Sequence, residues 1–460
     1  MKSRSANSRI NFICMTVAIG GLLFGYDTAV ISGVINLVKS QYSLSTSMEG
    51  WLVSCGLLGC IIGVLGTGIL SDRAGRRKTI LLAGGMFLIS SVGCAFSTSF
   101  QFLVIFRLAG GIGVGMASVV SPMYIAEFAP AEKRGKMIAW YQLAITVGIL
   151  LAYFSNALLV FLAKNNFENA FMQWFLKTET WRPMFLVMGI PSFIFVLLLT
   201  RIPESPRWLV SVNKREKAKK ILLAVRPQLL AMKELKDMEQ AAQKASEKKK
   251  SVLDPSLRLP LIIGIVLAVL QQFSGINAII YYGPGIFESA GINSSNALLF
   301  QVIIGAVNLL FTLVAIRWAD QYGRKRLLTI GLSGIILSLT GCGILFYTGH
   351  AQGVLLLVLM LLFIACFAFS LGPVTWIIIN EIFPTEVRVK AVSICVLSLW
   401  IAVWLVGQFF PWLLEKSGAA FTFWMFAAFS LINFIFCWKI VKETTGKTLE
   451  EMEQVFLSTH

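Results

Sequence analysis

The stretch SDRAGRRK, residues 71–78, is a short basic segment between two long apolar runs. A variant of this stretch, ADQYGRKR, stands at residues 319–326, again between apolar runs. Each copy places an acidic residue, Asp72 or Asp320, shortly before a glycine and a cluster of basic side chains. The two acidic residues are 248 positions apart, which is more than half of the 460-residue chain. This spacing favours a chain built from two related halves.

A second pair of motifs repeats at nearly the same distance. In two later loops an acidic residue stands seven positions before an arginine, and the two copies are 254 residues apart. These residues are Glu127 with Arg134 and Glu381 with Arg388. Two different motifs at almost one offset, in corresponding loops, indicate a duplicated unit. Such duplication is typical of transporters whose two halves move around a central site.

The composition identifies the chain as a polytopic membrane protein. Hydrophobic residues make up 57% of it and charged residues only 14%, with a mean hydropathy of +0.76. So little charge cannot cover the surface of a soluble domain of this size. The net charge of +17 is compatible with nucleic-acid binding, but the basic residues lie in loops between apolar runs and form no face interleaved with aromatics. We therefore expect a lipid bilayer around the chain and no nucleic-acid partner.

Twelve apolar runs are close to the ~20 residues with which a helix crosses a bilayer. An even number of spans places both termini on one side, and the basic loops share that side, which predicts that it is cytoplasmic. We expect a multi-pass protein of the inner (plasma) membrane. The predicted spans of this all-α fold are 11–36, 50–70, 79–97, 101–123, 137–160, 183–200, 257–282, 296–318, 327–348, 353–379, 389–410 and 420–440.

The long polar stretch between spans six and seven divides the chain. Apolar residues recur there at helical spacing with lysines between them, which predicts amphipathic helices on the cytoplasmic face. We predict four segments: an N-terminal six-helix bundle at 1–200, a cytoplasmic amphipathic-helix linker at 201–256, a C-terminal six-helix bundle at 257–441 and a cytoplasmic tail at 442–460.

Several longer motifs resemble those of one known family. Besides the paired loops, these are PMYIAEFAPAEKRGK at 122–136, PESPRWL at 203–209, QQFSGINAIIYY at 271–282 and ETTGKTLEEM at 443–452. Over essentially its whole length the chain resembles the sugar porters of the major facilitator superfamily, and most closely the bacterial sugar:proton symporters such as the D-xylose:proton type. The resemblance implies the major facilitator fold, in which two six-helix halves are related by a pseudo-twofold axis.

The charged residues of the repeated loops predict a gate on the cytoplasmic side. Acidic and basic side chains at helix ends can pair when the inner pathway is shut and separate when it opens. Each such pair near the surface contributes about a kcal/mol, which suits a reversible contact. A role in topology alone is the alternative for each arginine. The candidates are Asp72, Arg76, Glu127, Arg134, Asp320, Arg324, Glu381 and Arg388.

Neutral polar side chains predict the substrate site, because sugar hydroxyls both donate and accept hydrogen bonds. One helix face of span five, expected to line a cavity, carries Gln142, Thr146, Ile149, Tyr153 and Asn156. In span seven, Gly275 and the pair Gly283-Pro284 predict a break that gathers its polar residues. Helical geometry adds Tyr281 to the sugar-binding positions that the resemblance implies, which are Gln142, Gln271, Gln272, Asn277, Asn308, Trp376 and Trp400. The alternative for any one of them is interhelical bonding.

Two departures from the family pattern limit the choice of sugar. Ile149 stands where xylose-type symporters have a glutamine, and Leu399 stands where members often have Gln or Asn. Both changes remove hydrogen-bonding groups and make the predicted pocket more apolar. The sequence therefore predicts a monosaccharide without choosing between pentose, hexose and cyclic polyol.

Asp27 is the only charged residue between Ile10 and Val38. A carboxylate at membrane depth normally pairs, titrates or lines water. Arg107, in span four, is the only arginine of the N-terminal spans away from the cytoplasmic loops. The resemblance implies that the two form a proton-coupling pair, whereas facilitators of the family carry asparagine in place of the aspartate. Our hypothesis is that protonation of Asp27 releases Arg107; a permanent ion pair is the alternative.

These features predict a proton-coupled symporter that imports a pentose or hexose by alternating access and works as a monomer. A passive sugar facilitator is the main alternative, followed by a drug exporter and a sugar sensor. An enzyme is not expected, because the spans carry no histidine and no pair of carboxylates. We expect no cofactor and no metal, and we expect the eight cysteines, all within apolar runs, to be buried thiols.

Overall fold

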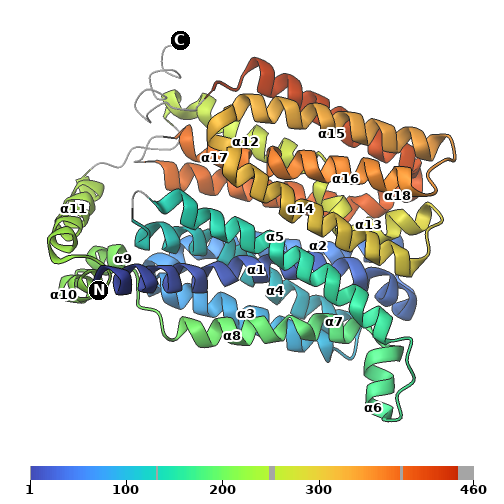
Figure 1. Ribbon diagram of the computed structural model, residues 1–460, viewed down its shortest axis with the longest axis horizontal. Coiled ribbons are helices and arrows are strands. Elements are labelled where there is room, and N and C mark those ends of the chain that lie inside the picture. Colours follow the sequence, from blue (N-terminus) through green and yellow to red (C-terminus); the bar gives the residue numbers. More distant parts are fainter. Residues whose placement is uncertain (1, 131–132, 248–253, 384–386, 444–460) are drawn as a thin grey trace.

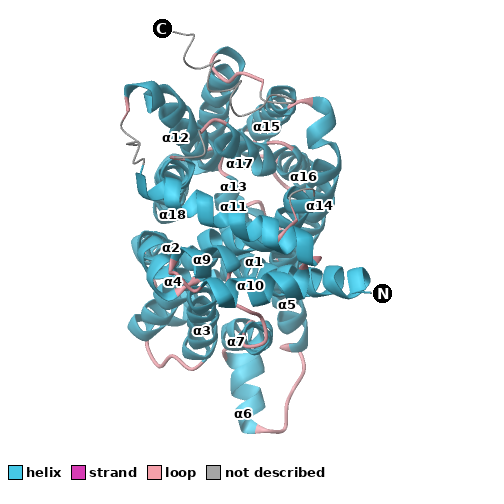
Figure 2. Ribbon diagram, turned by 90° about the vertical axis from the view of Figure 1, so that its left-hand side faces the viewer, coloured by secondary structure: helices cyan, strands magenta, loops and turns pink. Residues whose placement is uncertain are grey.

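The computed structural model describes the chain except for residues 1, 131–132, 248–253, 384–386 and 444–460. The residues that it describes form helices and loops, without a strand. Two helical bundles lie side by side, one formed by the helices within residues 2–199 and the other by the helices within residues 258–439 (Figure 2). This architecture confirms the predicted all-α membrane fold.

The N-terminal bundle provides six spans, the last of which is split. The spans are α1 (Lys2–Tyr42), α2 (Thr46–Ala74), α3 (Arg76–Ala95), α4 (Phe100–Phe128), α5 (Arg134–Leu162) and the pair α7 (Trp181–Val187) and α8 (Gly189–Leu199). The split comes just before Pro191, whose missing N–H cannot continue the helical hydrogen bonds. Between α5 and α7, the short α6 (Ala170–Met172) and a π-helical turn (Gln173–Thr178) project from the bundle (Figure 1).

The C-terminal bundle has the same plan with more interruptions. Its helices are α12 (Arg258–Gln272), α13 (Ile276–Ser289), α14 (Ser294–Tyr322), α15 (Arg324–Tyr347), α16 (Val354–Phe369), α17 (Leu371–Glu381) and α18 (Arg388–Lys439). Two spans are broken pairs, α12 with α13 and α16 with α17. Helix α18 holds two spans, because Gly418 in its middle is not helical (φ 76°, ψ 164°). The described helices thus supply the twelve predicted spans.

Several helices extend beyond the predicted spans. The first, α1, runs for 41 residues, whereas its apolar run predicts 11–36. A helix keeps its own backbone hydrogen bonds after it leaves the hydrocarbon, so hydropathy marks only the part in lipid.

The helices of the N-terminal bundle approach each other through glycines. Helices α2 and α4 are in extensive contact, and a Cβ atom at Gly111 of α4 would overlap the backbone carbonyl of Gly56 in α2. The same holds between α1 and α5, where a Cβ at Gly25 would overlap the carbonyl of Ile145. Such close backbone approach is the usual way in which helices pack in lipid.

The linker between the bundles folds into α9 (Pro206–Ser211), α10 (Arg215–Val225) and α11 (Gln228–Glu247). Their apolar faces pack together around Trp208, Leu222 and Leu235. These helices lie at the end of the bundles where α1 begins (Figure 1). We call this end, which also carries the loops at Arg76 and Arg324, the basic end.

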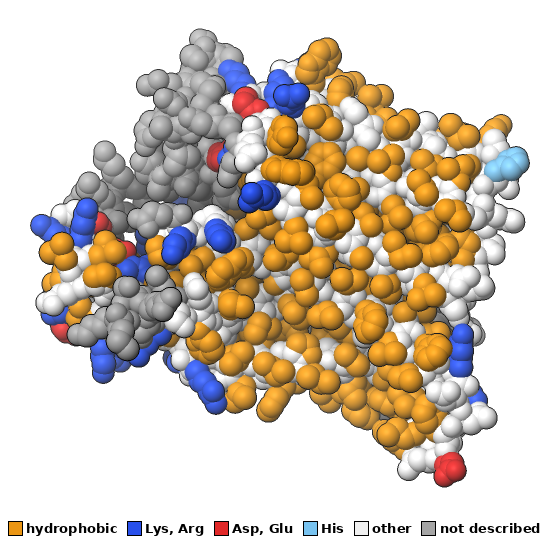
Figure 3. Space-filling view, viewed as in Figure 1, with side chains coloured by type: hydrophobic (Ala, Val, Ile, Leu, Met, Phe, Trp, Pro, Cys, Tyr) orange, Lys and Arg blue, Asp and Glu red, His pale blue; other side chains and the backbone are white. Residues whose placement is uncertain are grey.

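The outer surface divides by chemistry. Apolar side chains cover the long side of the molecule, and Lys and Arg gather towards the basic end (Figure 3). Large apolar residues such as Ile190 and Leu337 are 64% and 66% exposed. An apolar belt of this extent, on helices long enough to cross a membrane, is the surface that a lipid bilayer covers.

Candidate functional site

Asp27 of α1 and Arg107 of α4 form a buried ion pair inside the N-terminal bundle. Arg107 Nη1 lies 3.3 Å from Asp27 Oδ1 and 3.4 Å from the Asp27 carbonyl oxygen. The two residues are only 4% and 3% exposed, and the guanidinium carbon lies 5.7 Å from the centre of the Phe185 ring. The structure therefore brings together the two residues that the sequence predicts as a pair.

Small residues make room for this pair. A Cβ at Gly56 would lie 3.1 Å from Arg107 Nη2, and a Cβ at Gly110 would lie 3.1 Å from Asp27 Oδ1. Either substitution would crowd a charged group of the pair, and a Cβ at Gly110 would also overlap Ser90 Oγ. The glycines of the α2 and α4 contact thus also define the charged site.

A small cavity next to the pair is lined by both bundles. Its walls include Asp27, Arg107 and Cys60 from the N-terminal bundle and Tyr281 from α13 of the C-terminal bundle. Its volume of about 10 Å³ is close to the minimum that holds one water molecule. Because the cavity spans the boundary, a movement of one bundle against the other changes the surroundings of the carboxylate.

Three amide side chains of span seven form a hydrogen-bonded chain. Gln271 Nε2 donates to the carbonyl oxygen of Leu371 at 2.7 Å. Gln272 Nε2 donates to Gln271 Oε1 at 3.1 Å, and Asn277 Nδ2 donates to Gln272 Oε1 at 2.6 Å. Gln271 and Gln272 are buried and Asn277 is half-buried. The structure therefore groups three of the predicted substrate residues.

A break in the helix makes this grouping possible. Helix α12 ends at Gln272 and α13 begins at Ile276, and between them Gly275 has a positive φ of 87°. This left-handed conformation suits glycine, and a Cβ there would also come within 2.6 Å of the Phe426 ring. The predicted break at Gly275 is confirmed, whereas α13 continues as a helix through the pair Gly283-Pro284. The acceptor of Gln271, Leu371, is the first residue of α17, so two broken spans meet at this point.

Besides Tyr281 of α13, four other predicted substrate residues lie on four further helices. Asn308 of α14 and Trp400 of α18 are buried, and Gln142 of α5 and Trp376 of α17 are half-buried. The Trp400 ring lies 5.6 Å from the Phe24 ring of α1, across the boundary between the bundles. In the described residues no hydrogen bond joins the side chains of these four to the amide chain.

The predicted polar face of α5 divides between two neighbours. The Tyr153 hydroxyl donates to the carbonyl oxygen of Ile280 in α13 at 3.1 Å, across the boundary. Asn156 instead donates to the carbonyl oxygen of Val30 in α1 at 3.0 Å and is fully buried. The expectation that Asn156 lines the cavity is wrong. Steps of three and four drift around a straight helix by about 20° every seven residues, so the fifth position of the face already turns towards α1.

Three hydrogen bonds across the boundary lie far from the basic end and were missed by sequence reasoning. Asn36 Nδ2 donates to Glu288 Oε2 at 2.6 Å. Ser54 donates to Gln408 Oε1, and Gln408 Nε2 donates to the Ser47 carbonyl oxygen at 3.3 Å. With the Tyr153 contact they hold the bundles together at this end. Single polar residues within helices give no sequence signal for such pairing.

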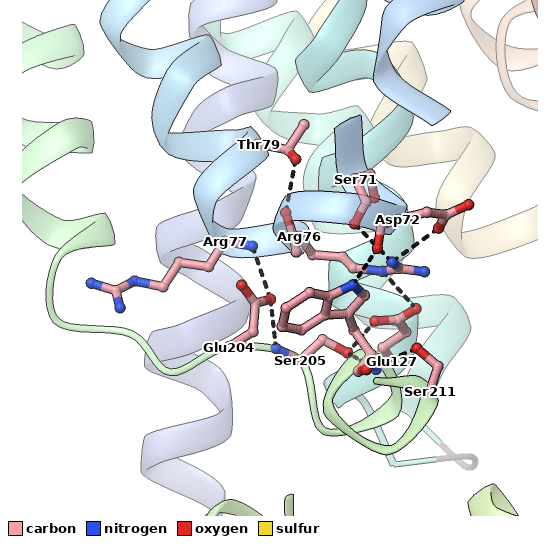
Figure 4. Close-up of polar contacts among 11 residues, drawn as sticks. Ser71, Asp72, Arg76, Arg77, Thr79, Glu127, Glu204, Ser205 and Ser211 are labelled. Atoms are coloured by element: carbon pink, nitrogen blue, oxygen red, sulfur yellow. Dashed lines mark hydrogen bonds and ion pairs between the residues drawn. The ribbon is translucent and has the colours of Figure 1, made fainter. Parts of the chain in front are cut away.

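Charged residues of the N-terminal bundle and of the segment after α8 form a cluster at the basic end (Figure 4). Arg76 lies between two acids, 3.1 Å from Asp72 Oδ1 and 3.4 Å from Glu127 Oε1. Glu127 also accepts a hydrogen bond from the Ser205 hydroxyl of the linker. Glu204 Oε1 accepts the backbone N–H of Arg77 at 3.0 Å. The predicted gate residues Asp72, Arg76 and Glu127 therefore do meet.

The C-terminal bundle repeats this cluster. Arg324 Nη2 lies 3.3 Å from Glu381 Oε1. Glu443 accepts the backbone N–H groups of Arg324 and Lys325 at 2.8 and 3.1 Å. The side chains of the gate candidates Asp320 and Arg388 lie outside the part of the chain that is described. Arg134 is exposed, and none of the described ion pairs includes it.

Sequence reasoning missed the function of Glu204 and Glu443. Each carboxylate caps the N-terminus of the helix after a repeated loop, α3 or α15, where free N–H groups favour a negative charge. Each loop turns at a glycine with positive φ, Gly75 at 98° and Gly323 at 84°. At both glycines a Cβ would crowd the capping carboxylate. The ion pairs of Arg76 and of Arg324 each join segments of one half.

Comparison with known proteins finds matches over nearly the whole chain. The sequence model of the family described as "Sugar (and other) transporter" matches residues 13–456. The arabinose-proton symporter of Bacillus subtilis (strain 168) is 41% identical over 446 residues, which cover 97% of this chain and 94% of the relative. The D-xylose-proton symporter of Escherichia coli (strain K12) is 38% identical over 488 residues, which cover 99% of this chain and 97% of the relative.

The fold is also similar to solved structures. The inward open conformation of the xylose transporter XylE from E. coli superimposes with a TM-score of 0.83 at 38% identity, and the match covers 97% of this chain and 99% of that one.

Proposed function

The chain belongs to the sugar transporter family, and we propose that it is a proton-coupled monosaccharide symporter of the inner membrane. The observation that carries the proposal is the buried Asp27–Arg107 pair, whose cavity is shared with Tyr281 of the other half. A titratable carboxylate that contacts both moving halves can couple a proton to their movement. Two relatives of nearly full coverage are named proton symporters of arabinose and xylose. The family is one of transporters, not of enzymes.

We assign sugar binding to the boundary between the halves. Gln271, Gln272 and Asn277 offer donors and acceptors that already bond to one another. A sugar hydroxyl can replace an amide in this chain and keep every polar group paired. Trp376 and Trp400 would supply the flat apolar surface that a sugar ring needs. We predict that Gln142 of α5 and Asn308 of α14 also bind the sugar.

The proposed proton step uses the ion pair. In water-poor surroundings Arg107 stabilises the ionised form of Asp27. Protonation of the carboxyl removes this attraction and frees Arg107, which lets α1 and α4 shift. Because the cavity is also lined by Tyr281, this shift is communicated to the half that carries most of the substrate residues.

The proposed orientation places the basic end in the cytoplasm. The loops that carry Arg76 and Arg324 lie at this end, and positive loops remain on the cytoplasmic side of inner membranes. Both termini would then be cytoplasmic. The opposite end, where Asn36 bonds to Glu288, would face outwards. We propose that one chain is the working unit, because the boundary site is complete within one chain.

Uptake by purified protein in liposomes tests the function. We would measure accumulation of radiolabelled L-arabinose, D-xylose and D-glucose with and without an inward proton gradient. A symporter accumulates at least one of these sugars above equilibrium, and a protonophore abolishes the accumulation. Equilibration that does not depend on the proton gradient would instead support a facilitator. If no monosaccharide is taken up, the assignment as a sugar transporter of this class is refuted.

The charged cluster at the basic end gives a first prediction. Glu127→Gln is expected to lower the maximal uptake rate about three- to fivefold, because it weakens a contact worth about 1 kcal/mol to Arg76 and Ser205. The sugar Kd should stay within about twofold, since the cluster is remote from the amide chain. Initial rates in proteoliposomes, corrected for the amount of protein, and Kd by isothermal titration measure the two quantities.

Arg73→Gln is the matched control for Glu127→Gln. Arg73 is an exposed residue in the last turn of α2, next to Asp72 of the cluster, and no described ion pair includes it. It should leave the uptake rate unchanged. An equal loss in the two variants, or a loss of Glu127→Gln that appears only in Kd, would contradict a gating role.

A further inference from the structure

A groove at the basic end lies between the start of α1, the segment after α8 and helix α10. Its volume is about 620 Å³. Its rim carries three cations, Arg9, Arg201 and Lys220, and its walls are apolar. We propose that this groove binds an anionic phospholipid of the inner leaflet, with the phosphate headgroup among the three cations and an acyl chain along α1.

The charge of the groove fits an anion. Arg9, Arg201 and Lys220 are all exposed and come from three separate segments of the chain. In the described residues none of the three takes part in an ion pair, whereas two other cations of the linker do: Arg215 pairs with Glu239, and Arg226 with Glu234. None of the described residues that line the groove is acidic. Three unneutralised cations around one hollow favour a ligand with a compact negative charge.

The walls favour a ligand that is also apolar. Phe12 is 45% exposed, and Ile13, Ile221 and Val225 line the groove beside it. One turn further along α1, Met15 is 61% exposed. This places an apolar track on α1 that starts at the groove and leads towards the lipid belt. Free inorganic phosphate would leave the track uncovered, whereas an acyl chain would cover it.

The position of the groove agrees with a lipid site. Arg9 lies just before the apolar run of α1, and Arg201 follows the last residue of α8, Leu199, so both mark the level where the chain leaves the hydrocarbon. Basic pockets at this level, on the cytoplasmic side, attract anionic headgroups. The inference rests on the proposed orientation. A bound lipid would fix the linker helix α10 to α1, two elements that are in contact.

Native mass spectrometry of the full-length protein in detergent tests the site. The probes are phosphatidylglycerol and phosphatidylcholine with identical acyl chains. We expect phosphatidylglycerol to bind at least about fivefold more tightly, because each nearby Lys or Arg contributes a factor of about five to the attraction of an anionic headgroup. The triple variant Arg9→Gln, Arg201→Gln, Lys220→Gln should remove this preference.

The control variant removes the same charge elsewhere on the linker. It combines Lys217→Gln, Lys233→Gln and Lys236→Gln, three exposed residues of α10 and α11 that do not line the groove. It should keep the preference for phosphatidylglycerol. If the first triple variant does not fold, Ala224→Glu, which puts a carboxylate into the groove, should have the same effect.

Three results would overturn the proposal. These are equal binding of the two lipids, an equal loss of preference in the groove and control variants, and displacement of the lipid by millimolar inorganic phosphate. The readout is lipid binding and not sugar uptake, so the proposed transport function can fail or hold independently of it.

Discussion

Asp27→Asn is expected to reduce sugar accumulation from about tenfold to none under an inward gradient of one pH unit. With one proton per sugar, such a gradient supports a concentration ratio of about ten. The amide is nearly the same size as the carboxylate, so it can remain beside Arg107, but it cannot take up and release a proton. Uptake should therefore stop at equilibrium while exchange of labelled for unlabelled sugar continues. Both are measured in proteoliposomes.

Glu49→Gln is the matched control. Glu49 of α2 is also a buried acid in an ion pair, with Lys39 at 2.6 Å, but it does not line the cavity beside Asp27. This variant should still accumulate sugar. Accumulation by Asp27→Asn would show that the proton is carried elsewhere. Loss of both accumulation and exchange, with a lowered melting temperature, would show that the pair with Arg107 is a permanent clamp.

The pairing of Asp27 with Arg107 could be predicted because membrane burial makes isolated charge costly. Each residue is alone in a long apolar run, so each needs a partner of the opposite sign at a similar depth. Gly275 was predictable for a similar reason, since a glycine among the polar residues of a span marks a place where the helix can break. In these cases a single residue and its neighbours in the sequence are enough to make the prediction.

The contacts of Glu204 and Glu443 could not be predicted in the same way. Each caps a helix that lies more than a hundred residues earlier in the chain. Their spacing of 239 residues differs from the offsets of the other repeated motifs, so the repeat does not reveal them. Contacts such as Tyr153 with Ile280 depend on how the two halves meet, which no local pattern encodes.

The order of the hydrogen bonds in the amide chain also could not be predicted from the sequence. The sequence predicts that Gln271, Gln272 and Asn277 share a site, and the structure adds that Gln271 is anchored to the backbone of Leu371. Gln271 thus links the breaks of spans seven and ten. A substitution of Gln271 should therefore weaken sugar binding more than a substitution of Asn277, which lies at the other end of the hydrogen-bonded chain.

Gln271→Ala is expected to weaken sugar binding about 10- to 100-fold. The variant removes one partner of a sugar hydroxyl and also leaves the Leu371 carbonyl and the Gln272 amide without their bonds. A buried polar group left unpaired costs about 1–3 kcal/mol, which corresponds to this range of Kd. Kd is measured by isothermal titration with the sugar that the uptake assay identifies, and the melting temperature is recorded alongside.

Asn433→Ala separates a binding role of Gln271 from general damage to the bundle. Asn433 of α18 is another fully buried amide in the C-terminal half, and its described side-chain bond is accepted from the Cys437 thiol at 3.4 Å. Its loss should change the melting temperature by an amount similar to that of Gln271→Ala but leave Kd within about twofold. An unchanged Kd in Gln271→Ala would show that the amide chain is not part of the sugar site. Equal weakening in both variants would mean that the amides only hold the helices together.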